Sequence, residues 1–493
     1  MTADSSPPPG PKGARPTASL VGLLAGPALC LALAALPAPE GLGREAWLTA
    51  GVAIWMAVWW LTQAVPLAVT ALLPALLFPM LGIAKAADAA HPYAHPLVFL
   101  FLGGFVIALT IERWNLHRRV AIAIVTVAGV RPDRLIGGFM LATAGLSMWV
   151  SNTATTLMMV PIGLSVVAFI EGHRQNGAPP TPAQDRFARG LLLAIAYAAS
   201  IGGTATLIGT PPNAFLAGYL AQNHGVDLGF ARWMLLGIPL ATVMLLAAWL
   251  LLTRVLYPGN GLDLARVAAG IAAEKARLAP PTRGEALTAL LFATVALAWV
   301  FQPLIDTLIP ISDTAIALTG AVAAFAIPVN LKKREFLMDW DHAIHLPWGI
   351  LILLGGGFSL AEAIQTTGLA ASLGNLVAGG DHLPLILLLL AITGLVVFLT
   401  EITSNTATAA VFIPVAAALA ISMGFDAVTF AVPVALAASC AFMMPVATPP
   451  NAIVFAAGRL DVMHMCAAGI FLNLIATVMI AGAALVLVPI VFG

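Results

Sequence analysis

Apolar segments long enough to cross a bilayer recur along almost all of this 493-residue chain. A transmembrane helix needs about 20 predominantly apolar residues. Only 9% of the residues are charged, against about 25% in an average soluble protein, which is too little to cover a soluble domain of this size. The sequence therefore predicts an all-α polytopic membrane protein with about 11 transmembrane helices, at 18–37, 46–64, 66–83, 96–112, 190–220, 232–253, 284–305, 312–329, 345–363, 427–457 and 463–491.

The charged residues and cysteines exclude several classes of protein. The 22 basic and 22 acidic residues give a formal net charge of zero, so there is no basic surface for nucleic acid. Cys30, Cys440 and Cys466 lie in apolar stretches, with neither a disulfide framework nor a metal-ligand spacing. Walker A, G-x-S-x-G and H-E-x-x-H motifs are absent from the sequence. We therefore predict no enzyme, no catalytic residue and no cofactor.

Two further apolar stretches, 135–170 and 383–422, are each interrupted by the same Ser-Asn-Thr cluster. Each half is too short to cross a membrane comfortably, so we expect two re-entrant helical hairpins that enter and leave on one side. Non-helical backbone at that depth is tolerated only against protein or a water-filled cavity.

The distribution of Lys and Arg predicts the orientation, because cytoplasmic loops carry an excess of these residues. With the N-terminus inside, eleven crossings and two re-entrant hairpins place 19 basic residues in the cytoplasm and leave Arg44, Lys85 and Arg232 outside. Had either hairpin been a single crossing, the later basic loops would have moved outside. The C-terminus is then external, and the Pro-rich residues 1–17 are expected to be a disordered cytoplasmic tail.

The two halves of the chain share two motifs in the same order. S-N-T-A-T occurs at 151–155 and 404–408, and T-P-P-N-A occurs at 210–214 and 448–452. In the expected topology the first hairpin opens to the cytoplasm and the second to the outside, so the repeat is inverted. Inverted repeats with broken helices in matching places point to a secondary transporter and its binding site.

The hairpin tips have the chemistry of an anion site. Ser, Asn and Thr are good N-cap residues, and an apolar helix follows each tip. A helix N-terminus presents unpaired N–H groups and a partial positive charge. With the hydroxyl and amide groups of the tip, it can bind a carboxylate.

The T-P-P-N motifs predict breaks in two membrane segments. Proline frees a carbonyl in the preceding turn and suits the first turn of a new helix. We expect unwound backbone at Gly209–Pro211 and Ala447–Pro449. Freed carbonyls beside a tip that carries Ser and Asn oxygens form an all-oxygen shell for a cation such as Na⁺.

Each motif taken alone has a structural explanation. A polar triplet in a membrane helix commonly joins helices, and Pro-Pro commonly kinks one, but both motifs occurring twice in opposite topology favours function. No Lys or Arg lies deep in the apolar segments near the motifs. A dianionic substrate would therefore be held by helix ends, hydroxyls and bound cations, which gives a reason for coupling.

The acidic residues near the hairpins have competing interpretations. Glu401 precedes the second tip and could carry a proton or bind a cation indirectly. The interpretation favoured here is a structural acid hydrogen-bonded within its hairpin, because Met148 occupies the matching place in the first. Glu362 and Asp381 are expected to be interfacial. His342 and His345 lie beside a basic loop, and a solvated turn is expected there rather than a metal site.

With these motifs, the chain resembles the divalent anion/sodium symporter family, which includes bacterial dicarboxylate transporters and their animal di- and tricarboxylate relatives. The likeness covers about 18–493, and two S-N-T tips with two T-P-P-N breaks form a specific pattern. The resemblance implies a homodimer in which a scaffold domain carries a transport domain with both hairpins and both broken helices. It also implies elevator motion coupled to Na⁺.

The resemblance also implies site residues, by motif position. The two Na⁺ sites would use Ser147, Ser151, Asn152 and Gly209, and then Thr400, Thr403, Asn405 and Ala447, with Gly209, Ala447 and Thr403 expected to offer carbonyl oxygens. The substrate would meet Ser151, Asn152 and Thr153 from one tip, Ser404, Asn405 and Thr406 from the other, and Thr448 and Pro449 alongside.

The complete S-N-T tips favour C4-dicarboxylates such as succinate, malate or fumarate, imported with Na⁺. The alternatives are a Na⁺-independent dicarboxylate exchanger, a citrate or sulfate transporter, and an anion channel of the same fold. The bacterial inner membrane is the expected location.

The resemblance divides the chain into a tail (1–17), scaffold helices (18–112), an interfacial helix with the first hairpin and broken helix (113–220), a scaffold helix and cytoplasmic arm (221–283), further scaffold helices (284–364), the second hairpin and broken helix (365–457) and a last helix (458–493). We expect 135–220 and 383–457 to move against 18–112 and 232–329. Two amphipathic stretches, after Glu112 and at 262–278, are expected to be interfacial arms.

Overall fold

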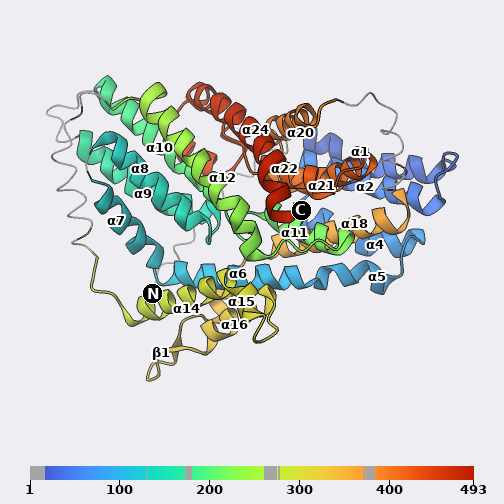
Figure 1. Cartoon of the computed structure of the whole chain (residues 1–493), viewed down its shortest axis with the longest axis horizontal. Coiled ribbons are helices and arrows are strands. Elements are labelled where there is room, and N and C mark those ends of the chain that lie inside the picture. Colours follow the sequence, from blue (N-terminus) through green and yellow to red (C-terminus); the bar gives the residue numbers. More distant parts are fainter. Residues whose placement is uncertain are drawn as a thin grey trace.

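A computed structural model describes residues 17–129, 131–171, 180–259, 262, 275, 278–369, 372 and 383–493 (Figure 1). Helices make up most of this part, and the strands described form one antiparallel pair, β1 (Pro328–Asn330) with β2 (Glu335–Phe336). Seven helices of the described part are long and apolar enough to cross a membrane, and shorter apolar helices accompany them. The prediction of an all-α polytopic membrane protein is confirmed.

The helices follow the predicted segments closely. The first half contains α1 (Thr17–Ala35), α2 (Arg44–Thr62), α3 (Leu67–Thr70), α4 (Leu73–Leu81), α5 (Ala86–Ala90), η1 (His91–Ala94), α6 (Pro96–Arg113), α7 (Leu116–Ala128), α8 (Pro132–Ser147), α9 (Asn152–Glu171), α10 (Pro182–Gly203), α11 (Pro211–His224), α12 (Phe230–Leu250) and η3 (Leu251–Leu256). The second half contains α14 (Arg283–Val300), α15 (Gln302–Ile305), α16 (Asp313–Ala326), α17 (Trp340–Ala343), α18 (Trp348–Thr366), α20 (Leu385–Leu399), α21 (Asn405–Ser422), α22 (Val428–Ala438), α23 (Pro449–Ala456) and α24 (Val462–Phe492).

Both interrupted stretches form helical pairs around their polar clusters. Helices α8 and α9 lie against each other, as do α20 and α21 (Figure 1). In each pair the serine of S-N-T ends the turn, and the asparagine and threonine begin the second helix. The second arms are longer than expected, with 20 residues in α9 and 18 in α21. At 1.5 Å per residue they are about 30 and 27 Å long, so the expectation that each half is too short does not hold for these arms. The tip is set by the polar turn.

Both T-P-P-N segments are broken helices, but the breaks are longer than predicted. The helical backbone stops at Gly203 and resumes at Pro211, and in the second repeat it stops at Ala438 and resumes at Pro449. The prolines start the second helix as expected, since proline suits the first turn. Unwinding begins well before them, because distant side chains bond the freed backbone, as described below.

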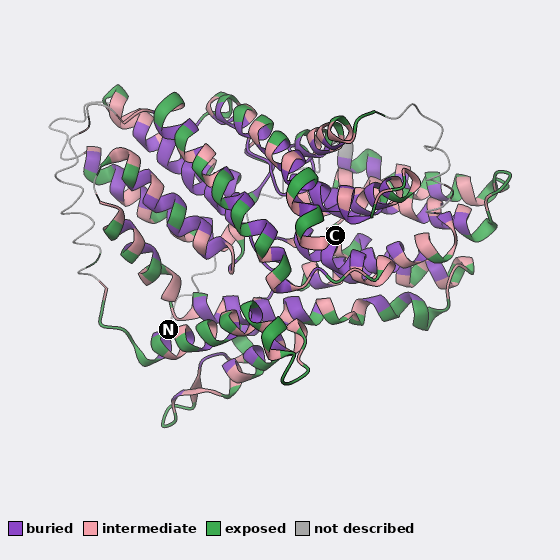
Figure 2. Ribbon diagram, in the orientation of Figure 1, coloured by how far each residue is buried: buried purple, intermediate pink, exposed green. Residues whose placement is uncertain are grey.

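The core lies where the broken helices cross the molecule. Every residue of α10 from Gly190 to Gly203 is buried, and almost every residue of α22 is buried too (Figure 2). A helix that is apolar all round is typical of a position enclosed by other helices. The other helices pack around α10 and α22, which therefore hold the two breaks at the centre of the protein.

Glycines at matching positions of the two repeats let a helix of each repeat pack closely on the other repeat. A Cβ atom added to Gly103 of α6 would lie 2.6 Å from the carbonyl carbon of Ala317 in α16. In the second repeat, a Cβ on Gly356 of α18 would overlap the Ala71 carbonyl, between α3 and α4. Each of these helices thus packs at backbone distance on the other half of the chain. These glycines belong to a shared G-G-F motif at 103–105 and 356–358.

Helix α7 is separate from α6, as expected of an arm after Glu112. Asn115, with a φ of 52°, turns the chain between them, and Gly129, with a φ of 83°, separates α7 from α8. Arg119 of α7 forms an ion pair of 3.1 Å with Glu285 of α14, while α7 also packs on α8. The arm therefore joins a scaffold helix to the first hairpin. The second predicted arm, 262–278, lies almost wholly outside the described residues, as do the tail to residue 16 and Asp381.

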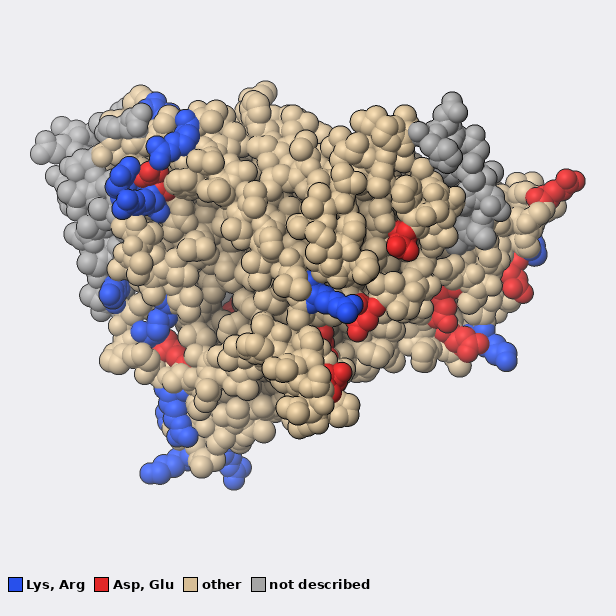
Figure 3. Space-filling model, in the orientation of Figure 1, with Lys and Arg blue, Asp and Glu red and all other residues tan. Residues whose placement is uncertain are grey.

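Charged residues join the C-terminal end of α6 to the residue before α17 (Trp340–Ala343), on the side expected to be cytoplasmic. Arg113 lies 2.7 Å from Asp339, and His342 also bonds this carboxylate. Burial by itself raises the pKa of Asp339, but hydrogen bonds from His342 and the charge of Arg113 bring it below its ordinary value. Figure 3 shows Lys and Arg gathered to the left and lower left, near the start of α10 and the β1–β2 turn, with Asp and Glu gathered to the right around α5.

Helix α12 packs mainly against α24 and α10, and less extensively against α14. The Trp233 indole donates a 3.0 Å hydrogen bond to the Thr204 carbonyl in the first break. A Cβ on Gly237 would lie 2.7 Å from the Ala205 carbonyl oxygen. The outer end of α12 is also bonded to α16, where the Phe230 N–H donates to Asp313 at 2.7 Å. Helix α12 therefore contacts both the first broken helix and α16.

Candidate functional site

The two hairpin tips place helix N-termini at the centre of the protein. The Ser151 hydroxyl accepts a 3.3 Å hydrogen bond from the Ala154 N–H and so caps α9. Ser404 occupies the matching place before α21 with an extended backbone, but its side chain forms no capping bond. The expected capping by serine is therefore present at the first tip alone, and the N-terminal N–H groups of α21 keep more of their bonding capacity for another partner.

Ser147 and Asn152 form the first cluster of oxygens. The Ser147 hydroxyl lies 2.6 Å from the Asn152 amide oxygen and 2.7 Å from the Ala199 carbonyl of α10. A Cβ atom on Gly203 would lie 2.5 Å from the same amide oxygen and 3.0 Å from the Gly209 carbonyl oxygen. The structure thus brings three of the four predicted residues together: Ser147, Asn152 and Gly209. Ser151 is directed to its own helix instead.

Thr400 and Asn405 form a second cluster with the same pattern. The Thr400 hydroxyl lies 2.8 Å from the Asn405 amide oxygen and 3.0 Å from the Ala438 carbonyl of α22. The Thr403 hydroxyl is instead bonded to Leu399 and Thr408, at 2.9 and 2.7 Å. The Thr403 hydroxyl is thus engaged within the hairpin, and the expected contribution of its carbonyl stays a prediction. Ala447 is buried in the second break, where its N–H donates to the Met444 carbonyl.

The asparagines of the T-P-P-N motifs hold the breaks open. The Asn213 amide donates to the carbonyls of Gly203, Thr204 and Thr206, the last at 2.9 Å. In the second break the Asn451 amide donates to Ala441 and Met444, at 3.1 and 3.0 Å. Carbonyls that lost their helical partners thus gain an amide donor, which removes most of the cost of unwinding buried backbone.

Glu401 closes the second break from the hairpin side. Its carboxylate accepts hydrogen bonds from the N–H groups of Phe442 (2.7 Å), Met443 (2.9 Å) and Met444 (2.9 Å). The Asn473 amide of α24 donates a further bond of 2.7 Å. Glu401 is only 4% exposed and is a satisfied structural acid, although its partners lie outside its own hairpin.

The first break uses a neutral side chain for the same purpose. The Thr206 hydroxyl donates to the Met148 carbonyl at the hairpin tip and accepts from the Gly209 N–H at 3.1 Å. Met148 occupies the place of Glu401, and no carboxylate from the described part of the chain bonds this break. The two halves of the site share a plan but differ by one buried negative charge.

The two repeats meet at their breaks. The hydroxyls of Thr210 and Ser439 lie 3.4 Å apart in a buried position, one in each break. The first hairpin helix α9 packs on α23 of the second repeat, and the second hairpin helix α21 packs on α11 of the first. Each broken helix therefore lies beside the hairpin of the other repeat, and the four motifs form one site.

The remaining predicted residues line this site without bonding one another. Thr153 and Thr406 are partly exposed, and their hydroxyls form no hydrogen bond to any part of the chain that the structure describes. The Thr448 hydroxyl caps α23 by accepting from the Asn451 N–H, and Pro449 is exposed beside it. Two hydroxyls, one at the start of each hairpin helix, thus remain free for a ligand.

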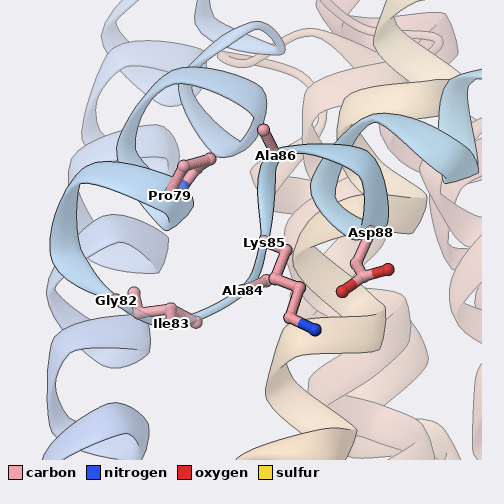
Figure 4. A pocket seen from close by; sticks show the side chains of 7 residues that line it. All are labelled: Pro79, Gly82, Ile83, Ala84, Lys85, Ala86 and Asp88. Atoms are coloured by element: carbon pink, nitrogen blue, oxygen red, sulfur yellow. The ribbon is translucent and has the colours of Figure 1, made fainter.

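A hollow of about 660 Å³ lies elsewhere, between α4 and α5 (Figure 4). It is open to the surface and lined mainly by small side chains, with Lys85 and Asp88 at its edge. None of its lining residues belongs to the four motifs, so we do not assign it to the site.

Several residues of this site were not predicted from the sequence. Thr206, Ser439 and Asn473 were missed, although each is a polar residue in an otherwise apolar segment, which was the available signal. Glu362 was expected at the interface, but the Gln222 amide donates to it at 2.8 Å between α11 and α18. Within the described residues no group of three His, Cys, Asp or Glu could hold a metal ion.

Comparison with known proteins shows similarity along nearly the whole chain. Residues 17–492 match the model of the sodium:sulfate symporter transmembrane region. The chain is 37% identical over 486 residues to the sodium-dependent dicarboxylate transporter SdcS of Staphylococcus saprophyticus, covering 96% of this chain and 92% of that protein. It is 38% identical over 482 residues to SdcS of Staphylococcus aureus strain RF122, again covering 96% and 92%.

Two solved transporters share the fold. The YdaH transporter of Alcanivorax borkumensis superposes with a TM-score of 0.60 at 15% identity, over 96% of this chain and 99% of that one. The MtrF protein of Neisseria gonorrhoeae gives 0.56 at 11% identity, over 95% and 94%. At these identities the similarity concerns the fold alone.

Proposed function

This chain belongs to the sodium:sulfate symporter family, and from that membership we propose that it imports C4-dicarboxylates such as succinate, malate or fumarate together with Na⁺. Its family and its structural neighbours are transporters, so the protein is a transporter rather than an enzyme. The match to SdcS supports a small carboxylate and Na⁺ as the transported species.

The observation that carries the proposal is the pair of matching oxygen clusters. In each repeat a hydroxyl at the end of the first hairpin helix faces the amide oxygen that starts the second, at 2.6 Å for Ser147–Asn152 and 2.8 Å for Thr400–Asn405. The unwound Gly209 carbonyl lies beside the first cluster, and the Ala438 carbonyl at the end of α22 lies beside the second. Hydroxyl, amide and carbonyl oxygens are the ligands that broken helices offer to Na⁺ in transporters. We assign one Na⁺ to each cluster.

The substrate is placed between the two tips. The N-terminal ends of α9 and α21 carry partial positive charge that favours a carboxylate, and the free hydroxyls of Thr153 and Thr406 can donate to it. One carboxylate at each tip accounts for the preference for a dianion. Two Na⁺ ions nearby lower the cost of placing two negative charges in this environment, which is the physical basis of coupling.

Uptake into proteoliposomes tests this function. Purified protein should concentrate radiolabelled succinate when Na⁺ is higher outside, and should lose that ability when choline replaces Na⁺. Accumulation driven by internal dicarboxylate without Na⁺ would instead identify an exchanger. Downhill flux without accumulation would identify a channel, and competition by citrate or sulfate alone would identify another substrate class.

Removing one tip hydroxyl should weaken substrate binding. Thr153→Val or Thr406→Val leaves a carboxylate oxygen without its donor, at a cost of about 1–3 kcal/mol, so the apparent KM for succinate should rise about 5- to 150-fold. Valine preserves the volume, so expression should stay near normal. Wild-type affinity in both variants would place the substrate elsewhere.

We also propose that the protein works by elevator motion of two bodies. The transport body contains α8–α11 and α20–α23, as the sequence led us to expect. We assign α24 to it as well, because α24 packs on α20 and α22. We also assign α12 to it, although the sequence led us to expect this helix in the scaffold, because Trp233 of α12 bonds the first break. The scaffold contains α1–α6, α14, α16 and α18. Helices α11 and α21 lie on the scaffold helices α18 and α2, while α9 and α23 contact mainly the transport body.

A crosslink between the bodies should stop transport. On a background lacking Cys30, Cys440 and Cys466, cysteines at Gln222 and Glu362 would join α11 to α18, whose side chains are 2.8 Å apart. Oxidation should abolish uptake and reduction should restore it. A matched pair at Glu171 and Arg459, 2.9 Å apart within the transport body, should leave uptake intact. Full uptake after complete crosslinking between the bodies would favour local gating by the tips.

We place the protein in the plasma membrane, with the N-terminus in the cytoplasm and the C-terminus outside. The basic residues near α10 and the β1–β2 turn (Figure 3) support this orientation through the excess of Lys and Arg on cytoplasmic surfaces. A homodimer formed through the scaffold completes the proposal, and crosslinking in native membranes would test it.

A further inference from the structure

Two phenylalanines and two glycines interlock where α11 meets α18. A Cβ atom on Gly218 of α11 would overlap the ring of Phe358, and a Cβ on Gly357 of α18 would overlap the ring of Phe215. Both rings are fully buried and their centroids are 5.8 Å apart. Each helix therefore contributes one ring and one notch, and the notch exists only because its residue has no side chain.

Polar contacts fix the register of the same two helices. One turn beyond the rings, the Gln222 amide donates to Glu362 at 2.8 Å. The Gln365 amide reaches the Asn223 carbonyl at 3.5 Å. The ring contacts and these bonds follow in the same order along both helices, so α11 and α18 run parallel. Together they fix the position of one helix along the other.

The internal repeat supplies a second pair of helices for the same kind of contact. Helix α23 matches α11 through the T-P-P-N motif, so Ile453 corresponds to Phe215 and Ala456 to Gly218. Helix α6 matches α18 through the G-G-F motif, so Gly104 and Phe105 correspond to Gly357 and Phe358.

This second pair is undocked in the structure. Ala452 and Ala456, which lie on one face of α23, are exposed. On α6, the nearest atoms to a Cβ on Gly104 belong to Ile208, at 3.2 Å, and not to α23. One repeat thus has its small-residue face docked, while the corresponding face of the other repeat is exposed among the residues that the structure describes.

We propose that the α11–α18 interlock is a latch that holds the conformation seen here, and that the exposed face of α23 docks on α6 in the opposite conformation. This inference rests on the proposed two-body motion and adds the residues that decide between its end states. Close packing of rings into notches favours two discrete positions over a continuous range, because packed interfaces are bistable.

Two substitutions should bias the latch in opposite directions. Gly218→Ala places a methyl group where the Phe358 ring lies, which disfavours the docked state and is tolerated once α11 leaves α18. Ala456→Leu leaves the present state unaffected, since Ala456 is exposed, but obstructs docking of α23 on α6. Gly482→Ala is the matched control, because a Cβ there meets no atom within 4 Å.

A cysteine at Ala452 reports the state without requiring transport. On the background lacking the native cysteines, Ala452→Cys should react rapidly with a maleimide while the face of α23 is exposed. Overpacking typically shifts such an equilibrium about 5- to 150-fold. Because the labelling rate follows the fraction of molecules in which α23 is exposed, Gly218→Ala should slow the reaction by up to this factor. Ala456→Leu and Gly482→Ala should react at the parental rate, and Ala456→Leu should also lose uptake.

The outcomes separate the latch from the substrate assignment. Parental reactivity in folded Gly218→Ala, verified by size-exclusion chromatography, overturns the latch, as does normal uptake by Ala456→Leu. If Gly218→Ala does not fold, the Ala456→Leu result decides. If Gly218→Ala slows labelling but the parental protein does not transport succinate, the latch is supported and the substrate assignment is rejected. If the parental protein concentrates succinate but Gly218→Ala is labelled at the parental rate, the substrate assignment is supported and the latch is rejected.

Discussion

Asn152→Ala and Asn405→Ala are each expected to remove Na⁺-driven succinate uptake almost completely. Each amide oxygen faces a hydroxyl of the hairpin, and the Asn152 oxygen also faces the unwound backbone at Gly209. In our assignment each asparagine serves a cation and the substrate together. Losing even an indirect partner of a bound metal typically costs about 10- to 100-fold in affinity, so losing a direct oxygen should raise the Na⁺ concentration for half-maximal uptake by at least that factor.

The measurement is uptake against Na⁺ concentration in proteoliposomes at equal protein density. Asn223→Ala is the matched control, because Asn223 lies in α11 outside both oxygen clusters, and among the described residues its amide donates only to the Tyr219 carbonyl, at 3.1 Å. Its Na⁺ response should be unchanged. If either site variant transports fully with the parental Na⁺ response, the cluster around that asparagine is structural and the cation site must be sought elsewhere.

Glu401→Leu is expected to prevent accumulation of folded protein. Four donors, three of them backbone N–H groups, converge on this buried carboxylate. Leucine would leave them all without an acceptor, and removing one partner from a buried charged arrangement costs about 3–5 kcal/mol. Glu401→Gln keeps one acceptor oxygen but points an amide N–H₂ at other donors, so it should fold in lower yield with a strongly reduced uptake rate.

Thermal unfolding followed by size-exclusion chromatography measures this effect. Glu362→Gln is the control, because Glu362 accepts a side-chain bond from Gln222 alone among the described residues and supports no unwound backbone. It should unfold close to the parental temperature. A Glu401→Gln protein with parental stability and altered proton dependence would reverse our interpretation and make Glu401 a proton carrier.

Much of the site was predictable because its motifs act locally. The S-N-T clusters interrupt apolar stretches, and a polar turn there predicts a tip whatever surrounds it. The prolines begin the helices at Pro211 and Pro449 for reasons contained in the proline ring itself. The extent of unwinding was not predictable, because the side chains that satisfy residues 441–444 are those of Glu401 and Asn451, and Glu401 is in turn bonded by Asn473 of α24.

The role of Glu401 illustrates the same limit of local patterns. The sequence indicated a satisfied acid, since the matching residue is Met148, but it indicated partners within the hairpin. The donors lie about forty residues further on, at 442–444. A hydrogen-bond partner at that separation is chosen by how the helices pack, and an isolated apolar segment contains no sign of it.

The sequence by itself determined the membrane class, the two hairpins, the two broken helices and the repeat, because hydropathy, polar turns and proline act over a few residues. Only the tertiary structure decided which oxygens face each other, that α12 contacts the first break, and that α11 docks on α18 while the matching face of α23 stays exposed. These outcomes depend on close packing between segments far apart in the chain. Because the two repeats carry nearly the same motifs, the sequence does not show whether α11 is docked on α18 or α23 on α6.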